Sequence, residues 1–105
     1  MIPEFEADEI LADLDTRLNS AQSFINGLET KIKPSDPALT PQNRKIVCDS
    51  LKKVLASMDD CMKATKDALD LLSAFDKARV LRRIALLEDQ RLSILDIQFD
   101  LMNPT

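Results

Sequence analysis

The chain has 105 residues and a formal net charge of −4, and 45% of its residues are hydrophobic and 30% charged. This size and composition fit one soluble globular domain, and the acidic balance disfavours nonspecific nucleic-acid binding, which needs a basic surplus. No apolar run approaches the roughly 18 residues of a transmembrane span, and no signal peptide pattern opens the chain. We therefore expect a cytoplasmic protein that makes no membrane contact.

The first predicted helix covers about residues 6–33. The chain has a single glycine and few aromatic residues, so leucine, alanine, lysine and aspartate dominate, and these favour helices. Apolar residues recur in alternating steps of three and four, as in a heptad pattern, and Pro34 ends the helix. This seam consists of Leu11, Leu14, Leu18, Ala21, Ile25, Leu28 and Ile32.

The second predicted helix covers about residues 41–72. Thr40 followed by Pro41 is typical of a helix start, with a hydroxyl N-cap and proline at the first helical position. Cys48 and Cys61 lie roughly 20 Å apart on this helix, too far for a disulfide, so we expect free thiols in a reducing compartment. A heptad seam repeats at Val47, Leu51, Val54, Met58, Cys61, Thr65, Ala68 and Leu72. The outer side is mostly acidic and carries Asp60, Lys63, Asp67 and Asp70.

The third predicted helix covers about residues 76–102 and is closed by Pro104. At 3.6 residues per turn, one of its sides faces the core, and a neighbouring side combines arginine, leucine and glutamine. The core side consists of Val80, Leu81, Ile84 and Leu87. The neighbouring side, which we expect to face outward, consists of Arg79, Arg83, Leu86 and Gln90, with Arg82 further round.

These three helices predict an all-α fold, an antiparallel three-helix bundle in a single domain over residues 1–105. The junction at residues 71–77 contains neither glycine nor proline, although Ser73 or Asp76 suits an N-cap. The alternative is one continuous helix of more than about 50 residues, which obliges two chains to pair as a homodimer through open or exchanged helices.

Catalysis finds little support in the sequence. The chain has no histidine, two distant cysteines and one glycine, so it offers no imidazole base, no thiol zinc site and no glycine-rich phosphate loop. The paired carboxylates Asp59-Asp60 and Glu88-Asp89 point in different directions on a helix and read as solvated charge. We expect no enzyme activity, no metal and no cofactor.

A protein-binding surface is the better hypothesis. Arg79 has an acidic residue, Asp76, three positions away, but Arg82 and Arg83 have no acidic residue at a distance of three or four. Arginines without a local carboxylate are suited to an external acidic partner or to another helix of the bundle.

The run Arg79-x-x-Arg82-Arg83, with Gln90 eight residues after Arg82, resembles the third-helix signature of the BAG domain, a three-helix cochaperone module. The second helix is similar at Cys48, Val54, Met62-Lys63 and Leu69-Asp70, so the resemblance covers nearly the whole chain. It implies binding to the ATPase domain of a 70 kDa heat-shock chaperone and promotion of nucleotide exchange. The partner-binding residues it implies are Asp59, Asp60, Asp70, Arg82, Arg83 and Gln90.

A structural role is the rival expectation. A spectrin-like repeat or a coiled-coil oligomerisation module would use the same heptad seams only to hold chains together. Such a module predicts oligomers or tandem repeats, and no effect of the arginines on chaperones.

Overall fold

The computed structural model describes residues 4–33 and 35–103, so Pro34 and Pro104, the predicted helix terminators, lie outside the described residues. Three long helices occupy most of the chain: α1 (Glu4–Lys31), α2 (Pro41–Asp67) and α3 (Ala74–Met102). A short 3-10 helix, η1 (Leu69–Leu71), follows α2. The molecule measures 54 × 20 × 17 Å, and no helix in its described part is long and apolar enough to cross a bilayer.

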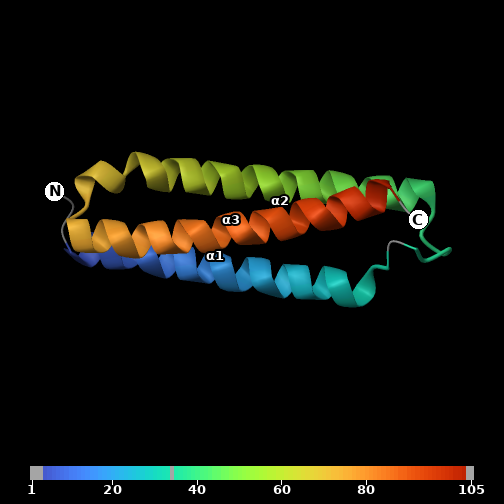
Figure 1. Cartoon of the computed structure of the whole chain (residues 1–105), viewed down its shortest axis with the longest axis horizontal. Coiled ribbons are helices and arrows are strands. Elements are labelled where there is room, and N and C mark those ends of the chain that lie inside the picture. The colour runs from blue at the N-terminus through green and yellow to red at the C-terminus, as the bar shows by residue number, and fades with distance from the viewer. Residues whose placement is uncertain (1–3, 34, 104–105) are drawn as a thin grey trace.

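The helices form the predicted all-α three-helix bundle. In Figure 1, α2 runs opposite to α1 and α3, and α3 lies between the other two. Most close approaches between helices involve α3, which packs against both α1 and α2. Since α1 and α3 run in the same direction, successive residues along α3 contact successive residues along α1.

The chain turns between α2 and α3, so the alternative of one continuous helix is wrong. The α-helix ends at Asp67, earlier than the predicted residue 72, and the backbone is extended at Leu72 and Ser73. Leu72 is buried, and the Ser73 hydroxyl accepts a hydrogen bond from the Asp76 amide at 3.2 Å, which makes Ser73 the N-cap of α3. A buried leucine and a capping serine thus make this turn without glycine or proline.

The predicted start of the second helix is confirmed. Thr40 is the N-cap of α2, and its hydroxyl accepts a hydrogen bond from the Asn43 amide at 3.1 Å, with Pro41 at the first helical position. The proline has no amide hydrogen to lose there, and its fixed φ suits the helix.

The core differs from the predicted seams in two places. On α2 the centre of the buried face is shifted by one residue: Val47, Val54 and Cys61 are only partly buried. The fully buried residues of that helix are Cys48, Leu51, Leu55, Met58 and Met62. On α3, Val80, Ile84 and Leu87 are buried as predicted, but the prediction for Leu81 is wrong, because it is 43% exposed. The apolar arc of α3 is too wide for two neighbours to cover.

Candidate functional site on the α2–α3 face

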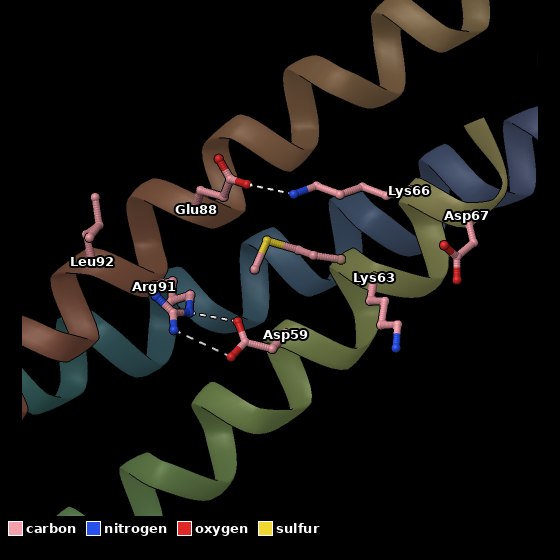
Figure 2. Close-up of a pocket in the computed structure, with 8 residues that line it drawn as sticks. Asp59, Lys63, Lys66, Asp67, Glu88, Arg91 and Leu92 are labelled. Carbon is pink, nitrogen blue, oxygen red and sulfur yellow. Dashed lines mark hydrogen bonds and ion pairs between the residues drawn. The ribbon is translucent and has the colours of Figure 1, made fainter. Parts of the chain in front are cut away.

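A shallow groove of about 610 Å³ runs between α2 and α3. Apolar side chains form part of it, and charged side chains of both signs line its walls (Figure 2). Its lining residues are Asp59, Met62, Lys63, Lys66, Asp67, Glu88, Arg91 and Leu92. The two helices form the walls of the groove and its long side is open to solvent, so another macromolecule can reach it.

Two ion pairs cross this groove and fix α2 to α3 (Figure 2). The Arg91 guanidinium donates to both oxygens of Asp59, at 2.7 and 3.5 Å, and Lys66 Nζ donates to Glu88 at 3.1 Å. A two-pronged guanidinium–carboxylate contact fixes orientation more than a single bond does. Asp59 is therefore already engaged within the chain, although its side chain remains 50% exposed.

Arg82 is the sequence-predicted site residue that the fold leaves most available. It is exposed on α3, and it makes no ion pair or hydrogen bond within the described part of the chain. Asp70 lies on η1, beyond the residues that line the groove; its side chain is 95% exposed and its carboxylate lies 3.7 Å from Lys77 Nζ. Both side chains can meet an external partner at little cost, since neither must first leave a buried contact.

The fold separates the neighbours Asp59 and Asp60. Asp59 faces α3, whereas Asp60 lies on another side of α2, in a hollow shared with Arg17 of α1 and Lys53. Consecutive helical residues differ by about 100° in direction, so one partner on the α2–α3 face would meet Asp59 and not Asp60.

The expectation that Arg83 and Gln90 face outward is wrong. The Arg83 guanidinium donates to both oxygens of Asp15 on α1, at 2.8 and 3.3 Å, and its side chain is only 23% exposed. The Gln90 amide donates to the Leu18 carbonyl of α1 at 2.8 Å. Its Oε1 atom is buried and has no hydrogen-bond partner among the described residues. Both residues hold α3 against α1.

Arg79 lies on the same side of α3 as these two residues. It contacts Asp8 of α1 at 3.7 Å and Asp76 at 3.3 Å, and it stacks over the Phe75 ring with 5.4 Å to the centroid. The residues that share a side in the sequence pattern therefore do share one in the fold, but that side faces α1. Arg82 lies further round the helix and is exposed.

Sequence reasoning missed the cross-helix partners Arg91, Lys66 and Asp15. The test applied to Arg82 and Arg83 looks for acids three or four residues away, which detects pairs only within one helix. The Arg83–Asp15 pair is separated by 68 positions and the Arg91–Asp59 pair by 32. Opposite charges on facing heptad flanks are the one signal that could have suggested them.

Comparison with known proteins gives no match to any protein-family model, curated protein or solved structure. The case for a function therefore rests on the residues and on their arrangement.

Proposed function

We propose that this domain is a cochaperone module that binds the ATPase domain of a 70 kDa heat-shock chaperone through the α2–α3 groove and the adjoining outer side of α3, and promotes nucleotide release. The observation that carries the proposal is Arg82, an exposed arginine without an acidic partner in the described chain, at the position that the BAG-like motif requires. A solvated guanidinium is well suited to two-pronged contact with a carboxylate of a partner.

The surroundings of Arg82 support this proposal. Asp70 presents an exposed carboxylate beyond the end of the groove, and Asp59 presents a half-exposed one on its wall. Between them and Arg82 runs the outer side of α3, with exposed Leu81 and Leu92. Separate positive and negative contacts around an apolar centre are what a specific protein interface needs.

The mechanism that we propose is binding to one conformation of the chaperone. A rigid, elongated bundle that fits the open ATPase domain better than the closed one shifts the population toward the open form, from which nucleotide escapes. The pairs Arg83–Asp15 and Arg91–Asp59 contribute rigidity, because they fix α3 to α1 and to α2. In this proposal Arg83 and Gln90 act by positioning α3. The domain performs no chemistry of its own, requires no cofactor, and works in the cytoplasm, where unpaired cysteines stay reduced.

Release of a fluorescent ADP analogue from a purified 70 kDa heat-shock chaperone tests the proposal. The wild-type domain should accelerate release, and Arg82→Ala should remove most of the acceleration while leaving helicity and melting temperature unchanged. Lys53→Ala is the matched control, because Lys53 is an exposed cation in the hollow between α1 and α2. No acceleration by the wild-type domain, or equal losses in the two variants, would refute the proposal.

The alternative is an oligomerisation module without chaperone activity. The exposed apolar positions of α3 favour it, since a closed bundle does not need them. That module would self-associate and leave ADP release unchanged.

A further inference from the structure

The outer side of α3 carries a second apolar stripe that no other helix among the described residues covers. Its residues follow heptad spacing, and the larger ones are well exposed, with Leu81 at 43%, Leu92 at 56% and Phe99 at 65%. This apolar seam consists of Ala78, Leu81, Ala85, Leu92 and Phe99. Heptad spacing on one helix is the pattern that packs against another helix.

Charged residues border the apolar seam on both sides. The border on the side of α1, here the α1-side edge, consists of Arg82, Asp89, Asp96 and Asp100. Asp89 lines a hollow with α1 residues, and so do Asp96 and Asp100; Arg82 lies two helical turns before Asp89. The border on the side of α2, here the α2-side edge, consists of Lys45, Lys52 and Lys63, with Asp67 in the last turn of α2. Lys63 lines the α2–α3 groove, and Lys52 and Lys45 precede Asp59 by seven and fourteen residues.

The two edges carry opposite charges at three levels along the bundle. Contacts between α2 and α3 give the levels: Lys66 meets Glu88, Asp59 meets Arg91, and the Cys48 carbonyl meets Gln98. On this scale, residues at about the same height on the two edges pair as Lys63 with Asp89, Lys52 with Asp96, and Lys45 with Asp100. Each of the three pairs joins a cation and an anion.

We propose that the occupant of the apolar seam is a second copy of this chain, related by a two-fold axis parallel to α3. This operation lays α3 beside α3 in the same direction and places the α2-side edge of each copy against the α1-side edge of the other. All three charge pairs then form twice, around a seam in which each residue meets its own counterpart. The self-complementary pattern is what selects a second copy as the partner.

The antiparallel arrangement is disfavoured by the same charges. With the axis perpendicular to α3, like edges meet, and Lys52 of one copy approaches Lys63 of the other while Asp89 approaches Asp96. Glu88 interrupts the seam in either arrangement, and Lys66 neutralises it at 3.1 Å. One polar position within a seam fixes register at some cost in stability.

The dimer does not depend on chaperone binding, so its test is the oligomeric state of the full chain. Analytical ultracentrifugation over a concentration series should show a reversible dimer. Lys52→Glu places like charges opposite Asp96 at two symmetric sites and should raise the dissociation constant roughly tenfold. Asp96→Lys should do the same, and the double variant should restore the wild-type value. A wild-type chain that stays monomeric overturns the proposal, and so does a double variant as weak as the single ones.

A cysteine at Ala85 tests the direction of the helices. In the proposed dimer this exposed alanine faces its own counterpart, so Ala85→Cys, in a chain also carrying Cys61→Ser, should form a disulfide-linked dimer under mild oxidation. Ser20→Cys, at an exposed position of α1, is the matched control and should not crosslink. Ala85→Cys mixed with Phe99→Cys should form a disulfide between the two different variants only in an antiparallel dimer, and that result would overturn the proposed geometry. Circular dichroism of each variant verifies that the bundle is folded.

Discussion

Replacing Arg83 with alanine should destabilise the bundle, whereas replacing the adjacent Arg82 should not. Arg83 forms a two-pronged pair with Asp15 at 2.8 and 3.3 Å, and its side chain is 23% exposed. Exposed pairs contribute about 0.2–1 kcal/mol, and this geometry puts the coupling near the upper end, at about 1 kcal/mol. Loss of the packed aliphatic stem adds about 0.5 kcal/mol.

The expected cost of Arg83→Ala is therefore about 1.5 kcal/mol, which lowers Tm by about 6–12 °C in a domain of this size. Arg82→Ala should stay within about 0.5 kcal/mol of the wild type, because its side chain contacts solvent. Urea unfolding followed by circular dichroism, with Asp15→Asn and the double variant, measures the coupling. High salt should reduce the Arg83–Asp15 coupling energy only partly, since the ion pair is partly buried. A coupling near zero, or equal stabilities of the Arg82 and Arg83 variants, would refute the assignment of Arg83 to the α1–α3 contact.

Three further predictions concern positions away from the proposed interface. Gly27→Ala should raise the free energy of unfolding by about 0.5–1 kcal/mol in urea titrations, because Gly27 is helical and an added Cβ meets nothing within 4 Å. A loss of stability would contradict the empty space found around position 27. Ser73→Ala should lower the same free energy by about 1 kcal/mol through loss of the α3 cap, and Ser73→Thr, which keeps the hydroxyl, should recover most of it. Burial raises the pKa of the Cys48 thiol, so its alkylation by iodoacetamide should be slower than that of half-buried Cys61. Peptide mass spectrometry measures the two rates, and a faster reaction at Cys48 would contradict its burial.

If the chain dimerises through α3, dimerisation and chaperone binding should compete. Both proposals use the outer side of α3 with its exposed Leu81 and Leu92, so a chaperone ATPase domain added to the dimer should dissociate it, and the disulfide-linked Ala85→Cys dimer should not accelerate ADP release. Reduction of that disulfide restores the reversible monomer–dimer equilibrium and provides an internal control. Chaperone bound to an intact dimer would show that the two surfaces differ.

The sequence by itself determined the helices, because their information is local. Period and composition predicted three helices, and the Thr40-Pro41 start is found as predicted, since a cap and its amide lie three residues apart. Heptad spacing also located most of the core, including Leu14, Leu51 and Leu87. The predicted partner-binding role of Arg82 needs a binding experiment, but its exposure agrees with the lack of a local acid.

Only the tertiary structure decided which way each side of a helix faces. Periodicity fixes the relative directions of Arg79, Arg83 and Gln90 but not what lies opposite them, and the packing of α1 along α3 turned this row into an internal contact. The turn at Ser73 likewise depends on burial of Leu72, which the bundle provides and the local sequence does not. The apolar seam appears for the same reason: two neighbours cannot cover the whole apolar arc of α3, so Leu81, Leu92 and Phe99 remain exposed.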